Sequence, residues 1–155
     1  MNDSKCEHAL ERSEFFKGLD KGYIKKITGL CQLQNYEPGQ YVFSQGDFGE
    51  HLYVIAEGQI SLERSVDLGT RKGSAVIGVL GKGRVLGCWS TLLGEPHNLM
   101  SSAVCQKPTE VLVIKGADLR EMMILDKQIG FILFERLCFL LRDRIQGAYG
   151  AMEKI

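Results

Sequence analysis

Residues 36–62 read YEPGQYVFSQGDFGEHLYVIAEGQISL, and this stretch decides the fold of the chain. Pro38 and Gly39 predict a tight turn, because proline fixes φ and glycine accepts positive φ. Tyr41–Phe43 and His51–Ile55 are short runs of strand-forming residues, and Gln59–Leu62 alternates polar with apolar side chains. Glycines separate the three runs. The stretch therefore predicts three short strands joined by turns.

The same stretch resembles the start of the cyclic nucleotide-binding domain family, which includes bacterial catabolite activator proteins and the regulatory subunits of protein kinase A. That family follows the pattern G-x-x-[IV]-[IF]-x-x-G-D-x-x-x-x-L-Y-[VIL]-[IL]-x-x-G-x-[IV]. The residues that match are Gly39, Val42, Phe43, Gly46, Asp47, Leu52, Tyr53, Val54, Ile55, Gly58 and Ile60. The resemblance extends from about Phe15 to Arg144 and implies a β-roll with flanking helices. It identifies the fold, whereas the ligand must be argued from the site.

Length and charge fit one ordinary globular domain over residues 1–155. The chain carries 19 basic and 19 acidic side chains, so its bulk charge favours neither nucleic acid nor an anionic membrane. No apolar run reaches the ~18 residues that a membrane span needs, and the N-terminus lacks the apolar core of a signal peptide. We therefore expect a cytoplasmic protein.

Cysteine and histidine usage gives no sign of a metal site or of catalysis. The five cysteines are odd in number and far apart in sequence, at Cys6, Cys31, Cys88, Cys105 and Cys138, so we expect reduced thiols. The three histidines are also far apart, at His8, His51 and His97. The sequence contains no G-x-S-x-G, Walker or H-E-x-x-H motif. We expect a protein that is not an enzyme.

Helices are predicted on both sides of the strands. Residues 7–18 and Lys21–Cys31 carry apolar stripes, which places N-terminal helices in residues 7–33. Residues 35–115 hold many short strands, with one helical turn at Trp89–Leu93. Further strands are expected at Ser74–Leu80, Met100–Cys105 and Thr109–Lys115. This spacing is typical of an antiparallel β-roll or jelly roll, so we expect a mainly β fold with flanking helices.

Two C-terminal helices are predicted within residues 116–147. The second, from Lys127 to about Gln146, is apolar on nearly every face, and a face left in water usually marks an interface. In the resembling family this helix pairs with its twin, which implies a parallel homodimer through the 127–146 helix. The contact residues would be Phe131, Phe134, Leu137, Leu140 and Leu141. Family members that read DNA carry a helix-turn-helix domain after this helix; none follows here, so we expect no direct DNA binding.

The resemblance also implies a phosphate-binding cassette, F-G-E-[LIV]-[AGS]-L-x-x-x-x-P-R-[STA]-A in the family. Its glycine and helix N–H groups approach the phosphate, its Glu accepts from the ribose hydroxyl, and its Arg binds the phosphodiester. Residues 86–99, LGCWSTLLGEPHNL, keep this frame without a gap. The implied ligand-binding residues are Gly87, Cys88, Trp89, Ser90, His97 and Asn98.

The cassette departs from the family at its two charged positions. Cys88 stands in place of the Glu and His97 in place of the Arg. A thiol is a poor acceptor, and a histidine has no bidentate fork. Each lost charged hydrogen bond costs about 1.5–3 kcal/mol, so two lower the affinity about 10²- to 10⁴-fold. Cyclic AMP or cyclic GMP would bind weakly, although Ser90 and Asn98 could donate to a phosphate.

Three functions stay open from the sequence. The first is a regulatory domain whose modified pocket binds cyclic nucleotide weakly, or takes another small ligand, and signals through the C-terminal helices. The second is a ligand-free dimeric module that interacts with itself or another protein, its pocket filled by Trp89 and Leu99. The third is a haem or redox sensor, because Cys88 and His97 are haem-ligand types in one loop and other family members bind haem or iron–sulfur clusters. No membrane partner is expected.

Overall fold

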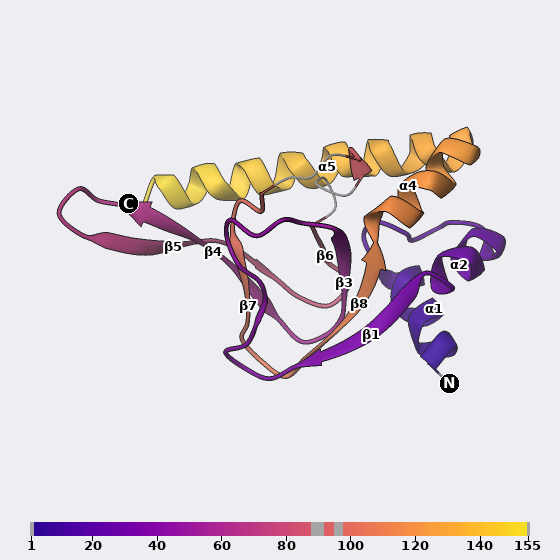
Figure 1. Cartoon of the computed structure of the whole chain (residues 1–155), viewed down its shortest axis with the longest axis horizontal. Coiled ribbons are helices and arrows are strands. Elements are labelled where there is room, and N and C mark those ends of the chain that lie inside the picture. Colours follow the sequence, from indigo (N-terminus) through magenta and orange to yellow (C-terminus); the bar gives the residue numbers. More distant parts are fainter. Residues whose placement is uncertain (1, 88–91, 95–97, 155) are drawn as a thin grey trace.

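The computed structural model describes residues 2–87, 92–94 and 98–154 of the chain, and Figure 1 shows their arrangement. The described helices are α1 (Asn2–Arg12), α2 (Lys21–Thr28), α4 (Gly116–Leu125) and α5 (Lys127–Met152). The described strands are β1 (Cys31–Tyr36), β2 (Tyr41–Phe43), β3 (His51–Glu57), β4 (Ile60–Asp67), β5 (Lys72–Leu80), β6 (Val85–Leu86), β7 (Ser102–Cys105) and β8 (Thr109–Lys115). The expected fold class, a β-roll between N-terminal and C-terminal helices, is confirmed.

The strands form two four-stranded antiparallel sheets, in the orders β1-β8-β3-β6 and β2-β7-β4-β5. In the first sheet β8 lies between β1 and β3, so that Ile114 pairs with Cys31 on one side and Leu52 on the other. Because side chains alternate along a strand, this sheet has two faces. Leu52 and Ile114 belong to one face, and their neighbours Tyr53 and Val113 belong to the other.

Each face of the first sheet covers its own apolar core. The helical core joins that sheet to the helices and consists of Cys6, Leu10, Phe15, Phe16, Ile24, Ile27, Leu52, Val54, Val85, Leu92, Leu112, Ile114, Leu119, Met123, Ile129, Leu133, Leu137 and Leu140. The roll core lies between the two sheets and consists of Ile55, Ile60, Leu62, Leu80, Leu86, Ala103, Cys105, Val111 and Val113. The first sheet therefore has apolar burial on both sides.

The C-terminal helices cover the roll along its length. Strand β8 ends at Lys115 and α4 begins at Gly116, with no residue between them. Helix α5 then runs back across the roll and packs on β5, so that its C-terminal end lies beside the β4–β5 hairpin (Figure 1). Asp126 begins α5 as its N-cap, because its carboxylate accepts from the Gln128 and Ile129 amides. Among the described residues, no helix combines the length and hydropathy that crossing a membrane requires.

The first helix lies earlier than expected. A helix over residues 7–18 was predicted, but α1 ends at Arg12 and the chain turns at Ser13, whose hydroxyl donates to Leu10 O. The reason is the adjacent pair Phe15 and Phe16, because both rings are fully buried and consecutive residues cannot share one helix face. The turn lets both rings enter the helical core in an edge-to-face contact.

The ends of α2 and α5 also differ from the prediction, and β5 and β7 each begin two residues from the expected position. Helix α2 ends at Thr28, and Cys31 begins β1, so the first strand occupies residues expected to be helix or connection. Strand β1 pairs along its whole length with β8, which supplies the hydrogen bonds that favour a strand. Helix α5 continues six residues beyond the expected end at Gln146, through Gly147 and Gly150, because its packing on β5 outweighs the low helix propensity of glycine.

Candidate functional site

The cassette segment, residues 86–99, leaves the first sheet at Gly87. Strand β6 pairs with β3 and ends at Leu86. Gly87 then takes φ +74°, and a Cβ there would lie 2.7 Å from His51 O and 3.4 Å from the Tyr53 ring. Only glycine accepts both the conformation and the contact. The backbone therefore begins the cassette pressed against β3.

The far end of the cassette is held by the loop between β2 and β3. Asn98 forms an isolated antiparallel bridge with Phe48. The Leu99 amide donates to Asp47 O at 2.7 Å, and the Gly46 amide donates to Leu99 O at 2.8 Å. Gly46 and Asp47 belong to the stretch that predicted the fold, and these bonds show what that turn holds in place.

The implied ligand residues are only partly within the described chain. Gly87 and Asn98 are described, and Asn98 is exposed. Cys88, Trp89, Ser90 and His97 lie outside the described residues. Leu99, which was expected to help fill the pocket, is buried.

A cavity of about 430 Å³ lies next to the start of the cassette. His51 and Tyr53, against which Gly87 packs, line it, and so do Gln32, Tyr36 and Lys115. The lining combines amide, phenol, imidazole and ammonium groups with the carboxylate of Asp118, which suits a ligand rich in hydrogen-bonding atoms. The sequence carried a signal for these residues, since strand alternation places Gln32, Tyr53 and Val113 side by side on one face.

Two tyrosines keep their protons in this cavity at neutral pH. Burial raises the pKa of Tyr53 to about 12, and burial also raises the pKa of Tyr36 above its ordinary value. The Tyr36 hydroxyl donates to Gln34 Oε1 at 2.7 Å. Both phenols are therefore neutral groups, which can donate or accept a hydrogen bond but cannot neutralise a phosphate.

At Leu92 the cassette contacts the C-terminal helices. Leu92 is fully buried in the helical core, together with Leu119 and Met123 of α4. Arg120 of α4 donates from Nη1 to Leu92 O. The cassette is thus attached to the roll at its two ends and to α4 near its middle.

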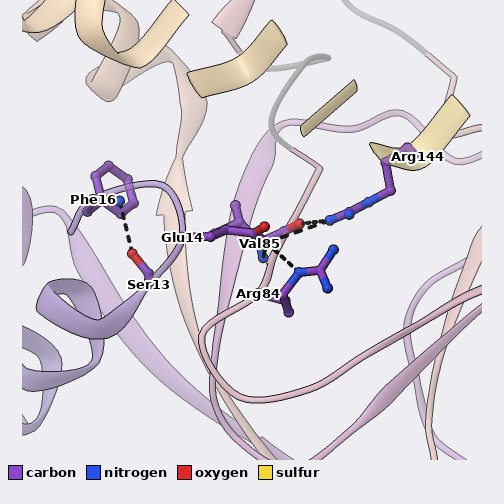
Figure 2. A network of polar contacts seen from close by, with 6 residues as sticks. All are labelled: Ser13, Glu14, Phe16, Arg84, Val85 and Arg144. Atoms are coloured by element: carbon purple, nitrogen blue, oxygen red, sulfur yellow. Dashed lines mark hydrogen bonds and ion pairs between the residues drawn. The ribbon is translucent and has the colours of Figure 1, made fainter. Parts of the chain in front are cut away.

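A polar network ties α5 to the strand that feeds the cassette (Figure 2). Glu14 Oε2 accepts from Arg84 Nε at 2.9 Å and from the Val85 amide at 2.8 Å. Arg144 of α5 donates to Val85 O, and its Nη2 lies 4.0 Å from Glu14 Oε2. Because Val85 is two residues before Gly87, this network fixes the base of the cassette against α5.

The five residues expected at a dimer interface separate into two groups. Leu137 and Leu140 are each only 4% exposed and pack in the helical core of their own chain. These two side chains therefore have little surface left for a partner, and the dimer proposal below does not rest on them. Phe131 and Phe134 are 68% and 38% exposed, and Leu141 is half-buried.

The exposed side of α5 extends beyond the residues that were expected. The α5 seam, as we define it, consists of Phe131, Phe134, Cys138, Leu141, Ile145 and Met152. Apart from half-buried Leu141, these side chains are exposed. With Ala148, the positions alternate steps of three and four residues, which is the spacing of a coiled-coil face.

Comparisons with known proteins agree with this geometry. The family model described as "Cyclic nucleotide-binding domain" matches residues 33–126. The cyclic AMP receptor protein of Thermus thermophilus is 28% identical over 132 residues, which cover 83% of this chain and 59% of that protein. Human cGMP-dependent protein kinase 2 is 37% identical over 54 residues, 35% of this chain. A cyclic nucleotide-binding domain from Methylobacillus flagellatus has a similar structure, with a TM-score of 0.79, 18% identity and coverage of 99% of this chain and 84% of that one.

The chain spans only part of the relatives it matches. The matched segments cover 59% of the Thermus protein and 7% of the human kinase. The activities and partners of those longer proteins are therefore statements about them. Among the described residues, no group of three or more His, Cys, Asp or Glu side chains could hold a metal ion.

Proposed function

This chain belongs to the cyclic nucleotide-binding domain family, and from that premise we propose that it is a regulatory ligand-sensing domain with a modified pocket. The pocket beside Gly87 binds cyclic AMP or cyclic GMP weakly, or takes another small polar ligand. Binding is signalled through α4 and α5. The observation that carries this proposal is the double attachment of the cassette, to the roll at Gly87 and Leu99 and to α4 at Leu92.

The weak affinity follows from the two exchanged positions of the cassette. With Cys88 and His97 in place of Glu and Arg, the cassette itself has neither the carboxylate for the ribose nor the guanidinium for the phosphate. The neutral phenols of Tyr36 and Tyr53 do not replace that charge. The proposed role is binding, and we assign no catalytic activity to the chain.

Thermal unfolding with millimolar cyclic AMP, cyclic GMP or buffer alone tests ligand binding. A ligand at 100 times its dissociation constant stabilises by about 2.7 kcal/mol, or roughly 5–11 °C for a domain of this size. Restoring both charged groups with Cys88→Glu and His97→Arg should tighten binding by about 10²- to 10⁴-fold. Gly87→Ala in the restored chain is the matched control, because its Cβ would meet His51 O and should abolish the gain.

If neither the natural nor the restored chain binds a cyclic nucleotide, that ligand class is wrong for this pocket. If only the restored chain binds, the two exchanges have removed cyclic nucleotide as the natural ligand. The search then moves to other small polar molecules.

A parallel homodimer is the second part of the proposal, and the α5 seam supports it. The seam has the spacing of a coiled coil and ends in Ile145 and Met152, which lie beyond the residues that pack in the helical core. In a parallel pair each seam residue faces its own copy across a two-fold axis. Such a dimer also fits the alternative function, a ligand-free interaction module.

Cross-linking through Cys138 tests this arrangement directly. Cys138 is exposed on the seam, whereas Cys6 and Cys105 are buried. We expect mild oxidation to link two copies, and Cys138→Ser to abolish the link. Sedimentation at tens of micromolar should show a dimer, which Phe134→Glu on the seam disrupts. Phe139→Glu is the control, because Phe139 is as exposed but lies off the seam under Arg142. A monomer at that concentration contradicts the proposal.

A further inference from the structure

Arg120 is the side chain of α4 that holds the middle of the cassette. It lies half-buried, and its Nη1 donates to Leu92 O. Its guanidinium also lies against Gly94, where a Cβ would come within 2.6 Å of Nε and 3.1 Å of Cζ. Gly94 has φ +74°, a backbone conformation that favours glycine. One side chain of α4 therefore contacts two residues of the cassette.

Arg120 and the buried Leu92 side chain attach the same short segment in different ways. The Leu92 side chain packs in the helical core by apolar contact, which is not directional. The hydrogen bond from Arg120 is directional and depends on where the Leu92 carbonyl lies. Packing alone would let the segment rotate over α4, whereas the hydrogen bond and the close contact at Gly94 fix its orientation.

The two ends of the cassette follow the roll. Gly87 rests on β3, and Leu99 is bonded to Asp47 in the loop between β2 and β3. The cavity beside Gly87 therefore lies near one end of the cassette, whereas Arg120 of α4 contacts Leu92 and Gly94.

On the premise of the proposed function, we infer that Arg120 is the positioning residue through which the occupancy of this pocket reaches α4. It fixes the orientation of residues 92–94 relative to α4, so that movement of the cassette turns α4 and, through it, α5. The coupling free energy between two sites is the same in both directions, so a change in the position of α4 also alters the cassette.

Hydrogen exchange of the ligand-free chain is the primary test. Arg120→Ala should speed amide exchange at residues 92–94 and 98–99 by about tenfold or more, and Gly94→Ala should do the same for residues 116–125. Strands β4 and β5 should stay unchanged in both variants, which separates a local coupling from a general loss of stability. Arg120→Lys keeps one donor without the fork and should restore part of the protection.

Glu121→Ala is the matched control, because Glu121 is the exposed neighbour of Arg120 on α4. It should leave exchange in the cassette unchanged. The inference is overturned if Arg120→Ala leaves the cassette unchanged, if Gly94→Ala leaves α4 unchanged, or if exchange rises equally in every element.

A second arm uses the chain that carries Cys88→Glu and His97→Arg. Saturating cyclic AMP should slow exchange across residues 116–152, and Arg120→Ala should remove this effect while nucleotide still binds. If the Arg120→Ala variant binds cyclic AMP and exchange across residues 116–152 still slows, the role of Arg120 is wrong. The proposed sensor function would stand. If neither the natural nor the restored chain binds nucleotide, the proposal of a cyclic nucleotide pocket is wrong. Hydrogen exchange of the ligand-free chain would still decide the role of Arg120.

Discussion

The helical core and the roll core share one sheet but differ in what builds them. The roll core receives side chains from strands alone. The helical core receives side chains from all four described helices, from the sheet and, at Leu92, from the cassette. The cassette follows β6 and precedes β7, so chain order places it in the roll. Leu86 at its start packs in the roll core, whereas Leu92 near its middle packs in the helical core, so the cassette contributes side chains to both regions.

Among the substitutions that distinguish the two cores, Leu92→Ala should lower the free energy of unfolding the most. Loss of a fully buried leucine costs about 2–5 kcal/mol, measured by chemical denaturation. Because Leu92 belongs to the helical core and its carbonyl accepts from Arg120 of α4, amide exchange in α4 should rise more than in β4. Leu86→Ala removes a leucine from the roll core and is the control, with a similar loss of stability but a rise centred on the strands. Equal patterns for the two variants would contradict the separation of the cores.

Glu14→Ala should have the next largest effect, because it breaks the network that joins β6 to α5. The partly buried Val85 amide and Arg84 Nε lose their acceptor together, which costs about 1–3 kcal/mol. Thermal unfolding gives the loss, and exchange should rise at Arg144 and neighbouring residues of α5. Glu11→Ala is the control, since Glu11 is exposed on α1 and should change little.

Acid should weaken the start of α5 by a smaller amount. The hydrogen bond from Tyr23 and the bonds from the Ile129 and Gln128 amides hold the pKa of Asp126 below its ordinary value of 3.8. A lowered pKa stabilises the fold above the ordinary value, and this contribution is lost as the pH falls through 3.8 to the lower pKa of the folded state. Melting curves between neutral pH and pH about 2.5 measure the loss. Tyr23→Phe should reduce this acid-induced fall in melting temperature. If the fall is unchanged, the hydrogen bond from Tyr23 is not what lowers the pKa of Asp126.

Val76→Thr should have the smallest effect, because it touches neither core. Val76 is exposed on β5, and substitutions at such positions stay within about 0.5 kcal/mol. Its melting temperature should match that of the natural chain. A larger change would indicate that the β4–β5 hairpin has a buried contact, for example in an assembled dimer.

Strand alternation and turn residues made much of the fold predictable. Tyr41–Phe43 and Thr109–Lys115 begin and end where they were expected. The errors arose where tertiary contacts overrode local preference. Phe15 and Phe16 ended α1 early because both are buried. Strand β8 pairs with Cys31–Tyr36 although only three of those six residues, Cys31, Leu33 and Tyr36, pack against an apolar core.

The site was less predictable, because its attachments involve the backbone. The acceptor for Arg120 is a carbonyl 28 residues away, and a carbonyl leaves no signature in a sequence. The α5 helix is apolar on most faces between Ile129 and Leu141, so periodicity alone could not decide that Leu137 and Leu140 face the core. The resemblance located the cassette and its two exchanged residues, which no single strand or helix pattern indicates.

Because β8 continues directly into α4, a rotation at the end of β8 would also rotate α4. No linker residue between Lys115 and Gly116 absorbs a rotation, and α5 has 26 residues. At 1.5 Å per residue α5 is about 39 Å long, so a tilt of about 10° at its base moves its far end by about 7 Å. Because α5 packs on β5, such a tilt would separate these two elements, and the distance between labels on Tyr41 and Tyr149 would measure it.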